Sequence, residues 1–536
     1  MILWIVGITI GAFAAYFSNF TPRGQNTLGA PKYTPVNNTI CDVLSLQVPG
    51  VVFTSHQNEF HESIGSYWSQ NAREVDPHCV VRPGTTQQLG EVVKILKGEF
   101  DDPKYGLPLK FAVKSGGHAP EKGVAGVDEG VIIDMALFNG VKVSEDKKFA
   151  TIGVGARWGY VSSKLDGLGL AVVGGRNADV GVGGLVLGGR CCDQDMKLAT
   201  NLLVGGISFF SPRYGFVCDN IEEYEIVLAN GTIVYATATQ HTPLWKALKG
   251  GGGNFGIVTN IRTKLMVSGK VWSGYLFSPS WHAPKIIEAF VDLCKAENFD
   301  EFVAGPIVTL VYVQKLGIRL TVTGLSYTKP EKWPKVYRAF KSFWPVWSTH
   351  KIQPLSSASK EFHDLAESGH RQAQMTTTFK ADLDTLLACN EIFIEKIAAF
   401  KKIRGGVLSP IFQSLCPAVV NHGSSNMLGL ALDPRQDCLV IVLLYTTWEK
   451  SEDDALANEI TQGLMSAFEK AAQDRGTAHS FRYLNYAGSN QDPINSYGQA
   501  NKKFLQDISK VYDPDGLFQL AKKGGFHLDL HDKPKY

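Results

Sequence analysis

Three glycine-rich segments constrain this chain more than any other feature of its sequence. They span residues 115–120, 181–189 and 250–256, and each follows or precedes an expected strand. Consecutive backbone N–H groups in such loops can form an anion-binding nest, and the missing side chains let the backbone approach a ligand closely. One cluster alone is most often a plain turn. Three in one domain indicate an extended, phosphate-bearing ligand, although neither the dinucleotide-binding GxGxxG motif nor a P-loop motif stands in its proper context.

The order of strand and helix patterns predicts more than one domain, because 536 residues are too many for one ordinary core. Residues 79–96 predict a strand, a turn and a helix, and residues 148–175 predict strand, helix and strand. Thr85 and Gln88 have capping-box spacing at the start of the first helix. Asn230 and Gly231 indicate a hairpin with a type I′ turn.

After about residue 268 the glycine clusters become scarce, and longer strands alternate with amphipathic helices. This pattern is typical of a sheet covered by helices. We therefore expect a signal peptide or short anchor over 1–18, a first domain over 45–267, a second domain over 268–480 and a C-terminal segment over 481–536.

The N-terminus and the cysteines indicate the secretory pathway. Residues 2–17 form an uncharged apolar run, shorter than the roughly 20 residues of a membrane span. We expect a secretory signal, with an uncleaved anchor as the alternative. Among nine cysteines, Cys41 and Cys79 are expected to form a disulfide, the alternative being two buried thiols. N-x-T sequons, typical of a glycoprotein, begin at Asn19, Asn37 and Asn230, although the expected turn already explains the last.

Composition excludes several other classes of protein. Hydrophobic residues make up 44% and charged residues 19% of the chain, which is typical of a globular protein. A net charge of +2 gives no reason to expect a nucleic-acid partner or an anionic membrane surface. We expect no metal site and a monomeric protein.

The chain resembles a known family through six stretches, which read RPGTTQQLGEVV, VKSGGHAP, DVGVGGLVLGG, SPRYGFVCDN, LWKALKGGGGNFGIVT and, late in the chain, YLNYA. They are similar to the FAD-linked oxidases of the berberine-bridge-enzyme-like type, in the vanillyl-alcohol-oxidase superfamily, and their texture is that of the fungal members. The motifs occur in the family's order and cover nearly the whole chain. The resemblance implies an α+β fold: a PCMH-type FAD-binding domain of two subdomains, and an α+β substrate domain with an antiparallel sheet covered by helices. The C-terminal segment would return to the flavin.

The resemblance also implies how FAD is held. His118 matches the histidine that bonds covalently to the flavin's 8α-methyl carbon, and Asn177 stands where many relatives have a cysteine that forms a second tether. A single covalent bond through His118 is therefore expected. Val180 matches a residue that gates oxygen access, where valine goes with oxidase behaviour, the alternative being a simply packed β-branched residue. The other residues expected to bind FAD are Ser115, Gly116, Gly117, Ala119, Gly181, Gly183, Gly184, Gly256, Ile257, Val258 and Asn485.

The YLNYA stretch supplies the expected catalytic base. If it is extended, alternation puts Tyr483 and Asn485 on one side and Tyr486 on the other. In the family a tyrosine of this motif deprotonates the substrate. Because an unperturbed tyrosine has a pKa of about 10, it needs a nearby cation or hydrogen-bond donors to act as a base at neutral pH. We expect Tyr483 to be the base, with Tyr486 in reserve.

The implied activity is that of an FAD-linked oxidase acting on a small organic substrate, such as an alcohol, an amine or a secondary-metabolite intermediate. A hydride would pass to flavin N5, and O2 would reoxidise the flavin to give H2O2. The alternatives are a dehydrogenase or oxidative cyclase of secondary metabolism and, in a different class, a flavin-binding protein without catalysis.

Residues 190–205 depart from the family inside a core motif. Deleting these sixteen residues restores LVLGGGISFFSPRYGF, the run that relatives have. The segment shows no helix or strand period, and its codons can be read as holding intron donor, branch-point and acceptor signals. We expect a retained intron or gene-model error, the alternative being a genuine surface insertion, which loops tolerate well.

Overall fold

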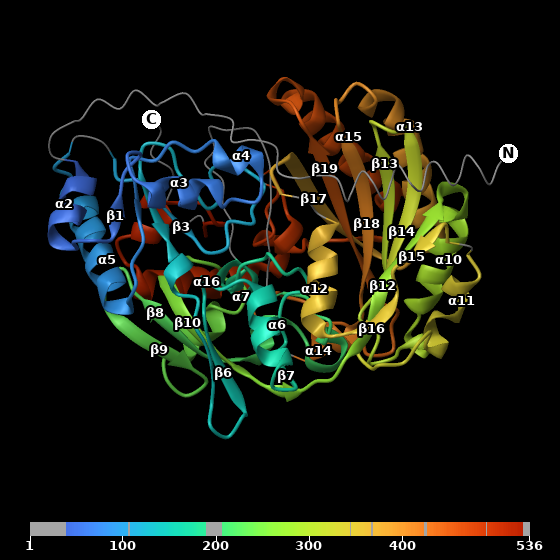
Figure 1. The fold of residues 1–536 in the computed structure, drawn as a ribbon, viewed down its shortest axis with the longest axis horizontal. Helices are drawn as coiled ribbons and strands as arrows, with labels where there is room; N and C mark the ends of the chain where they lie inside the picture. The colour runs from blue at the N-terminus through green and yellow to red at the C-terminus, as the bar shows by residue number, and fades with distance from the viewer. Residues whose placement is uncertain are drawn as a thin grey trace.

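The computed structural model describes residues 39–105, 108–188, 206–343, 345–365, 368–422, 426–488 and 490–528. They form two lobes joined side by side (Figure 1). Helices and mostly antiparallel sheets occur in both lobes, so the predicted α+β class is confirmed.

The first lobe contains two five-stranded sheets. One has the order β1-β2-β4-β3-β21 and is parallel except at β1, and the other has the order β5-β6-β10-β8-β9 and is antiparallel throughout. The strands of the first sheet are β1 (Val52–Phe53), β2 (Cys79–Val81), β3 (Phe111–Lys114), β4 (Val131–Asp134) and β21 (Lys522–Lys523). Those of the second are β5 (Val141–Val143), β6 (Phe149–Gly153), β8 (Ile221–Val227), β9 (Ile233–Thr237) and β10 (Ile257–Lys264). All residues of β4 are buried, as expected for a central parallel strand with both faces covered.

Helices cover these sheets and connect their strands. They are α2 (Ile40–Gln47), α3 (Asn58–Gly65), α4 (Gln70–Arg73), α5 (Thr86–Asp101), α6 (Trp158–Asp166), α7 (Val182–Leu187), α8 (Ser211–Tyr214), α9 (Thr242–Ala247) and, from the C-terminal part, α16 (Gln499–Tyr512). Strands β7 (Leu170–Ala171) and β11 (Met266–Val267) form a separate two-stranded sheet. Helix α5 begins after Thr85, whose Oγ1 accepts a hydrogen bond from the backbone N–H of Gln88 at 3.2 Å. The reciprocal half of the predicted capping box is not formed, because Gln88 Oε1 accepts from the backbone N–H of Gly84 instead.

The hairpin between β8 and β9 forms where it was predicted, but its turn type was predicted wrongly. Gly231 has a positive φ of 77°, whereas Asn230 does not, and a type I′ turn needs positive φ at both central residues. The Gly231 N–H donates to the carbonyl of Leu228 at 2.8 Å, and the Leu228 N–H donates to the carbonyl of Thr232 at 2.9 Å. This is the three-residue connection in which a left-handed glycine forms a bulge.

The second lobe is built on a nine-stranded antiparallel sheet with the order β15-β12-β14-β13-β18-β19-β17-β20, in which β16 also pairs with β12. Its strands are β12 (Val271–Pro279), β13 (Ile307–Val313), β14 (Ile318–Tyr327), β15 (Trp347–Ser348), β16 (Lys351–Gln353), β17 (Arg371–Lys380), β18 (Val407–Leu415), β19 (Leu439–Trp448) and β20 (Ala478–His479). The helices are α10 (Ala283–Leu293), α11 (Arg338–Lys341), α12 (Leu355–Asp364), α13 (Leu383–Phe400), α14 (Pro417–Asn421) and α15 (Asp454–Asp474). Helices α10, α13 and α15 pack on one face and α12 stands between the lobes (Figure 1). The predicted domain boundaries remain a prediction.

The C-terminal part returns to the first lobe, where β21 pairs in parallel with β3. Before it, the YLNYA stretch is a 3₁₀ turn over Leu484–Tyr486, so the predicted strand-like alternation is wrong. Instead of pointing to opposite sides, the rings of Tyr483 and Tyr486 meet edge to face with centroids 4.9 Å apart.

Two disulfides join described cysteines. The predicted Cys41–Cys79 bond is confirmed. A second bond, Cys416–Cys438, was not predicted. The three free cysteines among the described residues, Cys218, Cys294 and Cys389, are buried.

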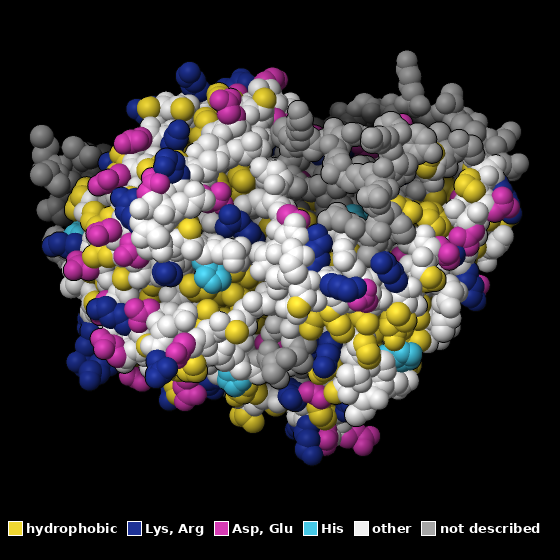
Figure 2. Space-filling model, turned by 180° about the vertical axis from the view of Figure 1, so that it is seen from behind, with side chains coloured by type: hydrophobic (Ala, Val, Ile, Leu, Met, Phe, Trp, Pro, Cys, Tyr) yellow, Lys and Arg dark blue, Asp and Glu magenta, His cyan; other side chains and the backbone are white. Residues whose placement is uncertain are grey.

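Two sequence predictions fall on residues outside those described. The predicted signal segment lies in residues 1–38, and the predicted insertion lies in residues 189–205. The chain re-enters at Gly206 beside α7, because a Cβ added to Gly206 would lie 2.9 Å from the side chain of Leu185. Among the described residues, no helix is both long and apolar enough to cross a membrane. Basic and acidic side chains are intermixed on the face shown in Figure 2.

Candidate active site

A cleft in the first lobe collects almost all of the residues predicted to bind FAD. It encloses about 960 Å³, part of it open to solvent. Twelve of the thirteen predicted residues line it, namely Ser115, Gly116, Gly117, His118, Ala119, Val180, Gly181, Gly183, Gly184, Gly256, Ile257 and Val258. Asn485 is not among the lining residues; it is buried behind Tyr483, to whose hydroxyl its Nδ2 donates at 2.9 Å.

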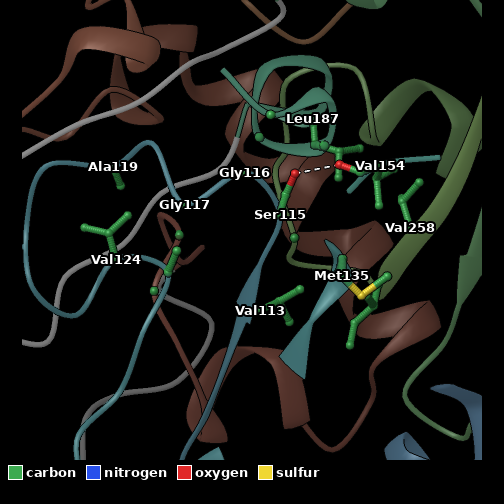
Figure 3. Close-up of a pocket in the computed structure, with 18 of the residues that line it drawn as sticks. Val113, Ser115, Gly116, Gly117, Ala119, Val124, Met135, Val154, Leu187 and Val258 are labelled. Carbon is green, nitrogen blue, oxygen red and sulfur yellow. Dashed lines mark hydrogen bonds between the residues drawn. The ribbon is translucent and has the colours of Figure 1, made fainter. Parts of the chain in front are cut away.

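Glycine is required where two of the cleft's loops cross. A Cβ added to Gly116 would lie 2.5 Å from the Cα of Gly181, a distance that side chains do not reach without moving the backbone. Ser115 fixes the same loop by donating from Oγ to the carbonyl of Val154 at 2.6 Å (Figure 3). The close-up shows Met135 and Val258 on one side of the drawn residues, Ala119 and Val124 on the other, and Val113 between them. The arrangement offers backbone groups and an apolar surface to a flat ligand.

Sequence reasoning missed the fourth segment of the cleft, which comes from the C-terminus. Residues Lys522, Lys523, Gly524 and Gly525 line the cleft, and both glycines have positive φ. A Cβ on Gly253 would lie 3.4 Å from Lys522 Nζ, so this lysine meets the third glycine segment. Lysine beside glycine loops suits a phosphate. The KKGG run itself was the signal that could have been read.

His118 is buried, with the indole ring of Trp68 on one face and the glycine loop around it. Its ring stacks on Trp68 with centroids 4.1 Å apart and an interplanar angle of 13°. The backbone N–H of Trp68 donates to the carbonyl of Gly117 at 2.9 Å. Neither ring nitrogen of His118 has a hydrogen-bond partner among the described residues. Burial, with the nearby charge of Arg157, lowers the pKa of His118 to about 3, so the imidazole is neutral at pH 7.

His118 also belongs to a trio that could hold a metal ion. Its ligand atoms, with those of Asp179 and His363, lie within 4.8 Å of one another. Asp179 is already engaged, because its Oδ1 pairs with Arg157 Nη1 at 2.6 Å. The trio therefore has one carboxylate that is already neutralised.

A second cavity, the chamber, lies between the cleft and the large sheet. It encloses about 1730 Å³, part of it open to solvent. Alternating residues of three neighbouring strands face it, because side chains point to opposite faces of a strand with a period of two; they include Ile307, Val311, Val313, Val407, Ile411 and Leu443. The intervening residues, such as Val308, Leu310, Leu408 and Phe412, pack under the helices. His118 and Val180 line both the cleft and the chamber, so the two cavities meet at these residues.

Both predicted tyrosines line the chamber, with different surroundings. The Tyr483 hydroxyl accepts from the backbone N–H of Ile207 at 3.0 Å and from Asn485 at 2.9 Å, and burial raises the pKa of Tyr483 well above its usual value. The Tyr486 hydroxyl accepts from Gln413 Nε2 at 2.9 Å and lies 3.4 Å from Arg176 Nη2.

The residue at the position of the second tether, Asn177, is fixed by its own loop. Its Oδ1 accepts from the backbone N–H of Asp179 at 2.9 Å, and the side chain lines the chamber. This local hydrogen bond is a turn that asparagine forms readily and cysteine does not.

The comparisons with known proteins agree with the cleft. An FAD binding domain model matches residues 77–198. The chain is 31% identical over 484 residues to the FAD-dependent monooxygenase tpcD of Cochliobolus heterostrophus, covering 86% of this chain and 87% of that protein. It is 32% identical over 484 residues to the FAD-dependent monooxygenase FUP4 of Fusarium proliferatum, with the same two coverages. Among solved structures it resembles a glucooligosaccharide oxidase of Acremonium strictum with a 6-S-cysteinyl, 8α-N1-histidyl FAD, at a TM-score of 0.67 and 19% identity over 92% of this chain and 98% of that one.

The cleft and the chamber thus define an FAD-dependent oxidoreductase. The chain belongs to the family of fungal FAD-dependent enzymes that includes tpcD and FUP4, and its fold is that of the berberine-bridge-enzyme-like and oligosaccharide oxidases among the solved structures. The residues present fit FAD: lining glycines that let two loops cross closely, lysines at one end, and a neutral imidazole with two buried nitrogens that no described residue satisfies.

Proposed function

We propose that this enzyme is an oxidase that removes a hydride from a small organic substrate bound in the chamber. One observation carries the proposal: His118 and Val180 line both cavities, so a flavin ring held in the cleft would border the chamber at these two residues. Bound FAD would supply a two-electron acceptor, taking the hydride at N5 and passing both electrons to O2 to give H2O2.

The chain's own residues would hold the substrate and exclude water. Valine, isoleucine and leucine side chains of β13, β18 and β19 provide an apolar wall. Tyr483, just before the 3₁₀ turn, and Tyr486 at its end bring two hydroxyl groups to the edge of that wall. Fixing the donor carbon against the cleft in a reactive orientation supplies much of the rate enhancement in such reactions. The product is the oxidised substrate, and the proton released from it must pass to a residue in the chamber.

Two tyrosines are candidates for that proton. The prediction from the sequence is Tyr483, but its burial disfavours the phenolate. A negative charge forming on the Tyr486 oxygen would instead receive a hydrogen bond from Gln413 and face the Arg176 guanidinium. We therefore infer that Tyr486 accepts the proton and that the Tyr483 hydroxyl orients the substrate.

Flavin reduction by a substrate found in a panel of alcohols and amines tests this assignment. Loss of a general base typically costs about 10²–10⁴-fold in rate, which we expect for Tyr486→Phe. Tyr483→Phe is the matched control, expected to change the rate less while flavin content stays constant. If Tyr483→Phe has the larger effect, the role returns to Tyr483.

We propose a single covalent bond from His118 to the flavin, with no second tether. The neutral, unsatisfied imidazole and the asparagine at position 177 support it. Acid precipitation of the pure protein should leave the yellow colour in the pellet, and His118→Ala should release it. Free extraction of the wild-type flavin would exclude the bond.

The oxidase half of the proposal can be tested before any substrate is known. Photochemically reduced holoenzyme is mixed with O2, and flavin absorbance and H2O2 are followed. An oxidase reoxidises quickly and releases one H2O2 per flavin, whereas a dehydrogenase reoxidises slowly. If Val180 gates oxygen, Val180→Leu slows this step, and Val313→Leu, which changes the far wall of the chamber, does not.

A monooxygenase is the second candidate, because relatives with 31% and 32% identity carry that name. Such an enzyme transfers one oxygen atom of O2 to its substrate and needs a separate reductant. Turnover under ¹⁸O2 separates the two. An oxidase product carries no label from O2 and is matched by H2O2, whereas a monooxygenase product carries one labelled atom.

We also propose that the chain is exported as a glycosylated monomer. The Cys41–Cys79 and Cys416–Cys438 bonds support an oxidising compartment. Mass spectrometry of protein from its native host should find an N-terminus beyond about residue 15 and a glycan on Asn37. Light scattering should give the mass of one chain. An intact N-terminus with reduced cysteines would contradict export.

A further inference from the structure

Arg176 is a buried cation whose partners in the structure are neutral. Arg176 directly precedes Asn177, the residue at the position of the second tether. It is only 9% exposed and lines the chamber. Its Nη2 donates to Gln413 Oε1 at 2.6 Å and lies 3.4 Å from the Tyr486 hydroxyl. The guanidinium carbon also stands 5.7 Å from the centre of the Phe362 ring. Within the described residues, no carboxylate lies within ion-pair distance of it.

The nearby acids are committed elsewhere. Asp179, three residues further on, pairs with Arg157 at 2.6 Å. Burial raises the pKa of Tyr275, and Glu361 is close enough to raise it further, whereas Arg176 lowers it. The Glu361 carboxylate nevertheless makes no ion pair with Arg176 and accepts a hydrogen bond from Gln353 Nε2 at 2.8 Å. A buried charge is costly unless it is paired and hydrogen-bonded. Retaining a cation here, at the wall of an apolar chamber, therefore needs a counter-ion that is not one of these side chains.

The guanidinium has donors left for such a counter-ion. Arg176 bonds through Nη2 alone, and neither Nε nor Nη1 donates to a residue of the described part of the chain. Neither nitrogen is a fully buried unsatisfied atom, and the residue lines the chamber, so these groups are open to a molecule bound there. Arginine to oxyanion bonds are among the strong hydrogen bonds in proteins.

We propose that Arg176 binds an anionic oxygen of the substrate, either a carboxylate or the ionised enol of a dicarbonyl compound. This rests on the proposed function, since it places the substrate in the chamber. The substrate is then an apolar carbon skeleton that carries one anionic group, held beside Tyr486 while the oxidised carbon faces the cleft. Neutral sugars and simple alcohols lack the group that this site selects.

Binding to the holoenzyme tests the proposal through perturbation of the flavin spectrum. For the carboxylate arm, 2-naphthoate is titrated against its neutral isostere 2-naphthamide. For the enolate arm, dimedone is titrated against its neutral methyl enol ether. A hydrogen bond to a charged group corresponds to about 10- to 100-fold in affinity, so one anion should bind the wild type more tightly than its isostere by that factor.

Three variants show whether Arg176 causes the preference. Arg176→Met should abolish it, and Arg176→Lys should keep part of it. Gln413→Glu, which is isosteric and sets a carboxylate 2.6 Å from Nη2, should abolish it while leaving the arginine in place. Retained flavin colour and an unchanged unfolding temperature show that each variant is folded.

Three results would overturn the proposal. One is a wild type with no preference for an anion in either arm, whether through equal affinity or through no binding. Another is an anion preference that survives both Arg176→Met and Gln413→Glu. The third is an Arg176→Met variant that keeps its anion affinity and shifts only the pH profile of flavin reduction, since Arg176 would then act through Tyr486. Reaction of the reduced flavin with O2 does not involve Arg176, so it judges the oxidase proposal separately.

Discussion

The neutrality of the buried His118 ring leads to a quantitative prediction about flavin attachment. A histidine with an ordinary pKa of about 6.5 would be only about 3% neutral at pH 5. Burial lowers the pKa of His118 to about 3, which leaves about 99% of it neutral at that pH. Only the neutral ring has a nitrogen lone pair with which to form the bond to the flavin. Covalent attachment should therefore be almost constant from pH 8 to pH 5, rather than falling by about 30-fold.

The assay needs no substrate. Apoprotein from riboflavin-starved cells is mixed with FAD at each pH, and acid-precipitable flavin is measured over time. His118→Ala gives the baseline, since it has no nitrogen to alkylate. Trp68→Phe keeps a ring stacked on His118 and is the matched control for the burial, because its smaller ring covers the imidazole less completely.

Attachment in the wild type that titrates with a pKa near 6 to 7 would contradict this prediction. The imidazole would then be more exposed to water than its stacked position implies, or another group would limit the reaction. The Trp68→Phe variant should attach flavin no faster than the wild type at pH 5, because weaker burial moves the midpoint up toward the ordinary histidine pKa. Attachment of flavin to His118→Ala would exclude this residue as the tether.

Three further predictions concern stability and the insertion. His350, stacked on Trp272, has its pKa lowered to about 4 by burial. The unfolded chain therefore binds more protons than the folded chain between about pH 4 and 6.5, so the free energy of unfolding falls as the pH drops through that window. In urea unfolding, His350→Gln should remove up to about 3 kcal/mol of this loss, whereas His56→Gln, at an exposed position, should not. Replacing both cysteines of Cys416–Cys438, which are 22 residues apart, should lower the free energy of unfolding by about 3 kcal/mol, and equal stability with and without the bond would contradict this. If residues 190–205 are a retained intron, cDNA should lack them, and protein without them should bind at least as much FAD; a dominant message that encodes them, with active yellow protein, would contradict this.

Local chemistry explains why so much of the cleft could be predicted from the sequence. Glycine at positions 116 and 181 is dictated by a backbone crossing, so the requirement is written in the residues themselves. The same holds for the N-cap of α5 at Thr85. What failed was choosing among turns: Asn230 with Gly231 suits two hairpin types, and the pair alone does not decide between them. The strand-like interpretation of YLNYA failed because five residues are too few for a period to be distinguished.

Non-local pairing explains what the sequence did not reveal. Lys522 and Lys523 reach the cleft only because β21 pairs with β3, from the other end of the chain. Cys416 and Cys438 close a bond that no local pattern marks. In the same way Arg176 stands next to Asn177 in the flavin motif, yet its hydrogen-bond acceptor Gln413 is 237 residues away.

The register of β18 decides whether that pair can exist at all. Gln413 lies opposite Ile307 of β13 and Ile441 of β19, and this register turns Gln413 toward the chamber and its neighbour Phe412 into the core under the helices. A slip of one residue would reverse every side chain of the strand. The sequence VLSPIFQSL carries apolar residues on both faces, so hydrophobic alternation does not say which face meets the core. That the Arg176 guanidinium is buried without a described anionic partner can be recognised only in the assembled sheet. The tertiary structure therefore indicates the chemistry of the substrate, whereas the glycine loops of the sequence already indicate the cofactor.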